Sequence, residues 1–384
     1  MRWNIAHPAV TNESQNEAPN VFIHTDAEAW PWRGSVLAVY LVRWETLLWD
    51  AGAGAGTVLV ARRVLPGRPG LALAAGALTA LNPHLLFISS VVNNDAAAAC
   101  LSTLTLWASI RLVQGSPAGA GTPETARTSE KAGMADAALL GILLGLSLLS
   151  KLSALALLPL VALALGLAWW DERGQEPRAL RTLLLRAAVV FGLAALVSGW
   201  WFARNWVLYG DPLAWSVWLI DIGVQHITLD ELIRQFGHVA TSYLSPYDGL
   251  LPEPVFWALG AGLAVAAAGW VGYLVQWAKG LPRLRLPRTD HGGEGFLCVD
   301  HNGLLLTGTW LVLLFASLVR YMTTTPSAEG RLLYPGIAAA SLWIVVGWAA
   351  LLPRRWARPT AGTALAALLV LCLAVPIFAI APRF

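Results

Sequence analysis

The chain alternates between long apolar runs and short polar segments over most of its length. A helix that crosses a bilayer needs about 20 mostly apolar residues, and runs of roughly that length recur from residue 35 onward. Ten candidate spans follow: 35–61, 70–92, 96–113, 136–150, 152–170, 187–207, 254–277, 303–322, 332–352 and 360–381. The pattern predicts an all-α polytopic membrane protein with about ten transmembrane helices.

Two parts of this pattern are irregular. The first run contains Arg43, Glu45 and Asp50, so its first half can be an interfacial amphipathic helix and only its second half a span. Lys151 divides the apolar stretch 136–170, which is too long for one helix. We therefore expect two spans joined by a tight turn at this lysine.

The composition narrows the class of protein further. Of the 384 residues, 57% are hydrophobic, 13% are charged and 20 are Trp. Soluble domains carry roughly 25% charged residues, so this chain has too few charges to cover a water-exposed surface. The composition excludes a soluble cytosolic enzyme, a disordered chain and a nucleic-acid-binding protein. Three cysteines are too few for a disulfide-based scaffold.

The basic residues indicate the orientation of the spans. If the N-terminal segment lies outside, 17 of the 26 Lys and Arg residues fall in the inside loops, as the positive-inside rule expects. This gives an extracytoplasmic segment at 1–34 and a transmembrane domain at 35–384. The inside loops 114–134 and 279–300 have the composition of flexible linkers. We expect a multi-pass protein of a bacterial-type plasma membrane.

The longest outside loop, 204–253, is too rich in Trp and Tyr to be a linker. Leu, Ile and Phe recur with helical spacing in its segment 228–243. We expect short interfacial helices here, lying on the outer leaflet.

Polar residues collect at the outside ends of the spans, where such groups are costly and tend to be functional. Asn93, Asn94 and Asp95 lie between the second and third runs. A carboxylate beside two amides can bind a divalent metal such as Mg²⁺ or Mn²⁺, orient a sugar hydroxyl or accept a proton. The alternative is a helix cap, in which an Asn or Asp side chain satisfies free backbone N–H groups.

Three cations lie on the same side. Lys151 separates two apolar runs, Arg204 closes the sixth run and Arg331 opens the ninth. Each can hold a phosphate that arrives from the outer leaflet. The alternatives are a snorkelling lysine, an aromatic belt with a boundary arginine and, for Arg331, a charge pair with Glu329 that caps the helix.

Further polar residues complete the candidate set. The candidate substrate-binding residues near these cations are Asn205, Tyr209, Asp211 and Tyr334. In the N-terminal segment, Asp26 and Glu28 are candidate acids or bases, with a solvated loop as the alternative. The sequence contains no phosphate-binding loop, no Gly-x-Ser-x-Gly, no His-Glu-x-x-His and no paired-cysteine motif. We therefore expect no nucleotide cofactor.

Taken in order, the outer motifs resemble those of the polytopic C-type (GT-C) membrane glycosyltransferases. The nearest resemblance is to family-39-like, protein mannosyltransferase-related and aminoarabinose transferase-like bacterial proteins. The strings that carry it are Phe22-Ile23-His24-Thr25 to Trp32-Arg33-Gly34, Asn82-Pro83 to Asn93-Asn94-Asp95, Ser150-Lys151-Leu152-Ser153, Trp201-Phe202-Ala203-Arg204-Asn205-Trp206 to Tyr209-Gly210-Asp211-Pro212, and Gly330-Arg331-Leu332-Leu333-Tyr334-Pro335. They extend over nearly the whole chain.

The resemblance implies a donor sugar on a polyprenyl phosphate in the outer leaflet and a glycan, lipid or protein acceptor. Asp95 would then line the transfer site or hold a metal, while Lys151, Arg204 and Arg331 would face the carrier phosphate. Such proteins open with a spanning helix and an outer loop that carries the first acidic motif. This chain begins within what resembles the end of that loop, so we expect a truncated form.

Two other classes of function stay open. One is a non-enzymatic membrane protein such as a transporter or lipid-carrier flippase, although transporters place polar groups at mid-membrane, on broken helices and within repeats. The other is an inactive, truncated transferase scaffold.

Overall fold

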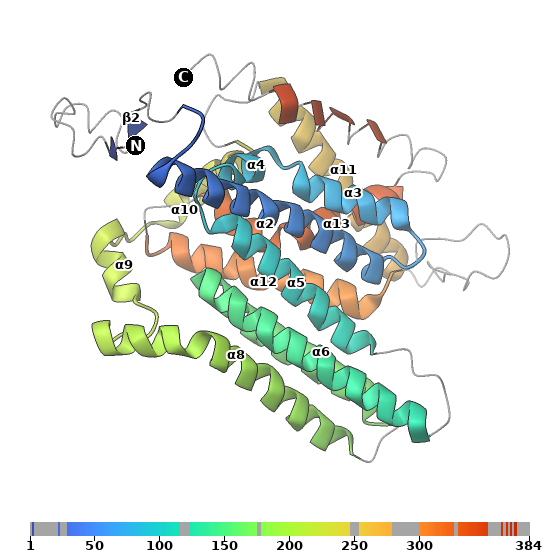
Figure 1. The fold of residues 1–384 in the computed structure, drawn as a ribbon. Helices are drawn as coiled ribbons and strands as arrows, with labels where there is room; N and C mark the ends of the chain where they lie inside the picture. The colour runs from blue at the N-terminus through green and yellow to red at the C-terminus, as the bar shows by residue number, and fades with distance from the viewer. Residues whose placement is uncertain are drawn as a thin grey trace.

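We describe a computed structural model of the chain (Figure 1). The described residues are 2–3, 22–23, 29–115, 123–174, 178–245, 253–278, 299–325, 329–351 and short pieces between 362 and 374. The predicted candidates Asp26 and Glu28 lie outside them, as do most of the candidate span 360–381 and of the linker 279–300.

The described part of the chain is almost entirely helical. Its helices are α2 (Gly34–Val64), α3 (Pro69–Ala80), α4 (Pro83–Ser89), α5 (Asp95–Gln114), α6 (Pro123–Ser150), α7 (Leu157–Glu172), α8 (Ala179–Tyr209), α9 (Trp215–Ile222), α10 (Leu229–Ser242), α11 (Glu253–Ala278), α12 (His301–Met322) and α13 (Ile337–Leu351). Two 3₁₀ helices, η3 (Leu152–Ala156) and η4 (Gly330–Gly336), precede α7 and α13. Strands β1 (Arg2–Trp3) and β2 (Phe22–Ile23) form one short antiparallel pair.

The chain is an all-α, multi-pass membrane protein, as the apolar runs predict. Within the described ranges, seven helices are long and apolar enough to cross a membrane, with η3–α7 and η4–α13 each counted as one. The α3–α4 pair raises this to eight if it forms one span, although it bends by 57°. The predicted run 70–92 is therefore interrupted, because Pro83 starts a new helix whose cap is Asn82.

The linkers and the outer loop differ in how far they follow the prediction. Residues 123–134 of the expected linker 114–134 belong to α6, which begins at a proline and is rich in good helix formers there. The expected helix at 228–243 is α10, and its start is fixed by a capping box between Thr228 and Glu231. The backbone N–H of Thr228 donates to the Glu231 carboxylate and lowers its pKa.

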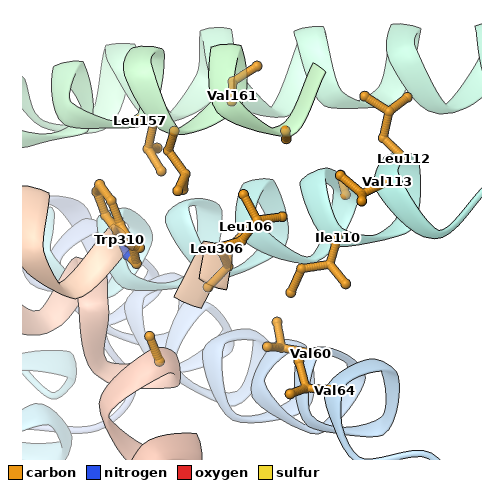
Figure 2. Close-up of a cluster of buried hydrophobic side chains, with 14 of the residues drawn as sticks. Val60, Val64, Leu106, Ile110, Leu112, Val113, Leu157, Val161, Leu306 and Trp310 are labelled. Atoms are coloured by element: carbon orange, nitrogen blue, oxygen red, sulfur yellow. The ribbon is translucent and has the colours of Figure 1, made fainter. Parts of the chain in front are cut away.

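The core is centred on α5. This helix lies between α2, α7 and α12, and it packs on α6 as well (Figures 1 and 2). The side chains labelled in Figure 2 that meet there are Val60, Val64, Leu106, Ile110, Leu112, Val113, Leu157, Val161, Leu306 and Trp310. Because α5 is held on several sides, its first residue is fixed relative to the neighbouring helix ends.

Candidate functional site

Asp95 is the first residue of α5 and is only 3% exposed. The N-cap of α5 is Asn94, and its side chain makes no capping hydrogen bond. Instead, Asn93 Oδ1 accepts the backbone N–H of Asp95 at 2.7 Å, which forms an Asx turn ahead of the helix. Asn94 donates from Nδ2 to the carbonyl of Ser150 at 2.8 Å and so connects this turn to the end of α6. The Asp95 carboxylate takes no part in this turn and has other partners.

Those partners are two of the predicted cations. Lys151 Nζ donates to Asp95 Oδ1, and Arg331 Nη1 lies 3.7 Å from Asp95 Oδ2. The side chains of Asp95, Lys151 and Arg331 are 4%, 18% and 33% exposed. The buried carboxylate thus holds two partly accessible cations that come from separate segments of the chain. We call Asp95, Lys151, Arg331 and Glu329 the cation cluster.

Glu329 is the fourth member of the cation cluster. Its Oε2 accepts from Arg331 Nε, and its side chain is 35% exposed, far more than Asp95. The charge pair considered as an alternative for Arg331 is therefore present, but it coexists with the contact to Asp95. Two carboxylates balance two cations, so an incoming anion must compete with Glu329 for Arg331.

A second layer of residues fixes the position of Arg331. The backbone N–H of Gly330 donates to Ser242 Oγ at 2.8 Å, which ties η4 to the end of α10. A Cβ at Gly330 would lie 2.2 Å from the backbone nitrogen of Tyr243, so only glycine permits this approach. The carbonyl of Ser242 also accepts from Nδ1 of the buried His84 of α4.

Sequence reasoning did not identify this layer. Ser242 and His84 show no motif, and their partners are distant in the chain. The one available signal was the glycine directly before Arg331, which is unusual enough to suggest close backbone approach.

Tyr334 lies beneath the cation cluster. It is fully buried, and its hydroxyl donates to the carbonyl of Tyr243 at 3.2 Å. Its ring packs against His84 and Tyr243 with centroid separations of 5.8 and 5.5 Å. Burial raises the pKa of the Tyr243 phenol above its usual range. The geometry gives Tyr334 a supporting position, with no free hydroxyl for a substrate.

The other predicted residues lie in the last turns of α8 and in its connection to α9, a region that we call the α8–α9 turn and that lies on the edge of the bundle in Figure 1. Arg204 is exposed, lies over the ring of Trp201 with its Cζ 5.1 Å from the centroid, and donates to Asn205 Oδ1 at 3.3 Å. Asn205 is buried and donates to the carbonyl of Pro212 at 3.4 Å. Among the described residues, no hydrogen bond or ion pair joins this turn to the cation cluster.

Asp211 and Tyr209 complete that turn. The backbone N–H groups of Ser216 and Leu213 donate to the Asp211 carboxylate at 2.9 and 3.0 Å and lower its pKa. Asp211 therefore shapes the turn that its Gly-Asp-Pro sequence predicts, while Tyr209 is exposed beside it. The structure thus gathers Asp95, Lys151 and Arg331 and leaves Arg204, Asn205, Tyr209 and Asp211 as a separate group.

The described surroundings of Asp95 do not fit a divalent metal. Mg²⁺ and Mn²⁺ require several oxygen ligands, whereas both oxygens of Asp95 face cations. No group of three His, Cys, Asp or Glu side chains suited to a metal occurs in the described part of the chain.

Comparison with solved structures found three structures of two proteins with a related arrangement of the chain. The crystal structure of ArnT from Cupriavidus metallidurans in the apo state has a TM-score of 0.48 and 17% identity, covering 87% of this chain and 50% of that one. ArnT from the same organism bound to undecaprenyl phosphate gives 0.44 and 18%, covering 88% and 51%. The oligosaccharyltransferase of Archaeoglobus fulgidus, tethered to an acceptor peptide, gives 0.41 and 14%, covering 91% and 44%.

The chain spans about half the length of these solved structures. No family model matches the chain, and no curated protein matches it. With identities of 14–18% and TM-scores of 0.41–0.48, the likeness by itself assigns neither a family nor an activity.

Proposed function

We propose that this chain is a membrane glycosyltransferase of the GT-C type. It moves a sugar from a polyprenyl-phosphate-linked donor to the hydroxyl of a glycan, lipid or protein acceptor. The reaction takes place at the extracytoplasmic face of a bacterial-type plasma membrane. The motif resemblance suggests this class, and the cation cluster is the observation that carries it.

The leaving group of the proposed reaction is a charged phosphate. In the proposed transfer, the acceptor oxygen bonds to the anomeric carbon, and the bond from that carbon to the phosphate oxygen breaks. The electron pair stays on the phosphate, which gains negative charge. Cations that are already in position stabilise such a charge without further reorganisation. Lys151 and Arg331 are partly accessible and are held in position by the buried Asp95.

This geometry changes the role proposed for Asp95. Both oxygens of the Asp95 carboxylate face cations, Oδ1 toward Lys151 and Oδ2 toward Arg331, so neither oxygen is free to approach an acceptor hydroxyl. We therefore assign Asp95 as a positioning residue for Lys151 and Arg331. The proton of the acceptor hydroxyl requires another base, and Asp26 and Glu28 remain the predicted candidates outside the described residues.

The depth of the site supports a lipid-linked phosphate. Lys151 lies between α6 and η3–α7, two helical segments that are each apolar enough to cross a membrane. Arg331 lies at the start of another such segment, η4–α13. A phosphate whose lipid tail stays in the bilayer can reach cations at this level.

The direct test is sugar transfer by the full chain in vesicles, from a radiolabelled polyprenyl-phosphate sugar to a membrane acceptor extract. We expect labelled acceptor with the wild type and strongly reduced product with Lys151→Met. Asp230→Asn is the matched control, because Asp230 forms an exposed ion pair with Arg234 and has no proposed role in sugar transfer. Product formation unaffected by Lys151→Met would contradict the proposal.

A second candidate function is a lipid-carrier flippase or transporter. The bend of 57° between α3 and α4 is the observation that favours it, since transporters build their sites on broken helices. This second function would be supported if the protein bound undecaprenyl phosphate at Lys151 and moved it from one leaflet of a vesicle membrane to the other without any sugar transfer.

A further inference from the structure

Asp50 is a buried acid that the proposed transfer site does not use. It lies on α2 and is 4% exposed. Its Oδ1 is buried, and no described residue donates a hydrogen bond to it. A buried polar atom without a partner is costly, and a carboxyl group in such a place is less costly to bury in its protonated form.

The surroundings of Asp50 are apolar. Its neighbours on α2, Trp49 and Ala53, pack in a cluster with Leu85, Ile88, Ala99, Cys100, Tyr334 and Ile337. Helices α2 and α5 approach each other closely here: a Cβ at Gly52 would lie 2.7 Å from Cys100 Sγ. This packing leaves little room for water around the carboxyl group.

No described charge compensates an ionised Asp50. The titratable groups within its electrostatic range are the thiols of Cys100 and Cys372 and the phenol of Tyr334, and all are neutral at pH 7. Lys151 and Arg331 are held by Asp95 and Glu329. Arg43 is seven residues earlier on α2, about 10 Å along the helix axis, and no ion pair joins it to Asp50 within the described residues.

The two carboxyl groups of this region therefore meet opposite environments. Asp95 contacts two cations, whereas ionisation of Asp50 would leave a charge in an apolar cluster that no described residue compensates. We propose that Asp50 is a buried proton-binding site, whose carboxyl group holds a proton and releases it as the pH rises.

The sign of the accompanying stability change follows from linkage. The folded state binds this proton more tightly than the unfolded chain, in which Asp ionises near pH 3.9. The wild type is thus stabilised by Asp50 at low pH and loses that stability as the pH rises. Asp50→Asn removes the ionisation and keeps the shape, so its melting temperature should exceed that of the wild type increasingly toward alkaline pH.

The primary test is infrared spectroscopy of the full chain in lipid. We expect a C=O stretching band of a protonated carboxyl group at neutral pH that is lost at alkaline pH and is missing in Asp50→Asn. Asp95→Asn should leave the Asp50-dependent part of this band in place. A spectrum without any Asp50-dependent band overturns the proposal.

A second measurement needs no variant. An apolar carbodiimide, dicyclohexylcarbodiimide, modifies protonated carboxyl groups in apolar surroundings, and peptide mass spectrometry locates the product. If Asp50→Asn fails to fold, this labelling decides: modification of Asp50 that falls with rising pH supports the proposal, and absence of modification at every pH overturns it.

One consequence rests on the proposed function. Tyr334 packs in the same cluster as the neighbours of Asp50 and lies three residues after Arg331 on η4, so binding of undecaprenyl phosphate should weaken at alkaline pH more in the wild type than in Asp50→Asn. The infrared and labelling experiments do not depend on sugar transfer, so a failure of the transferase proposal leaves them interpretable.

Discussion

The cation cluster and the α8–α9 turn look alike in the sequence but differ in construction. Both carry an arginine, an acid and aromatic residues at the outside end of a span. The cluster takes Asp95, Lys151 and Arg331 from three separate segments, whereas Arg204, Asn205 and Asp211 bond within their own turn. A motif that bonds within its own turn is typical of a turn or a membrane boundary, whereas a cluster completed by distant segments is the stronger candidate for a site.

The largest expected effect is that of Asp95→Asn. The change keeps the shape but removes the charge that holds Lys151 and Arg331, so transfer should fall by about a hundredfold or more. Product formation per folded protein measures it, with Asp230→Asn as the exposed control. Activity within the range of that control would mean that Asp95 has no part in the reaction.

Lys151→Met should have the next largest effect. It removes one of the two cations while preserving the length of the apolar stem, so undecaprenyl phosphate should bind about tenfold more weakly. A titration of the lipid into the protein in detergent gives the dissociation constant. Equal affinity in both proteins would place the phosphate elsewhere.

Glu329→Gln should act in the opposite direction. The partly exposed carboxylate of Glu329 competes with an incoming phosphate for Arg331. Partly exposed ion pairs contribute little energy. Neutralising Glu329 should therefore tighten binding of the lipid phosphate by only about threefold. The same titration measures the dissociation constant of the lipid for this variant. Weaker binding would show that Glu329 positions Arg331 instead of competing for it.

The smallest effect is expected for Arg204→Ala. This arginine contacts Trp201 and Asn205 and lies apart from the cluster, so transfer and binding should change by less than about twofold. A loss of lipid-phosphate binding as large as that in Lys151→Met would show that the α8–α9 turn and the cation cluster form one functional site.

The sequence predicted most of the fold because membrane spans are set by local composition. The division at Lys151 and the helix at 228–243 follow from local patterns, and α6, η3–α7 and α10 confirm them. Hydropathy alone could not show the break at Asn82 and Pro83, since both halves of that run are apolar. It also could not show that the linker sequence from 123 onward continues into α6.

The site was predictable only in part. The sequence identified Lys151 and Arg331 as cations at the outside ends of spans. That both contact Asp95 depends on how α5 packs, which the sequence does not show. The supporting contacts of Ser242 with Gly330 and His84 join positions far apart in the chain. Asp50 was visible as an acid within an apolar run, but only the packed helices show that its Oδ1 has no hydrogen-bond partner among the described residues.

The most direct test of the cation cluster is one set of equilibrium titrations with undecaprenyl phosphate on the wild type, Lys151→Met, Glu329→Gln and Arg204→Ala, compared at equal folded fraction. The account predicts the tightest binding for Glu329→Gln, then the wild type and Arg204→Ala together, and the weakest binding for Lys151→Met. Weaker binding by Arg204→Ala than by Lys151→Met, or the same affinity in all four proteins, would contradict it.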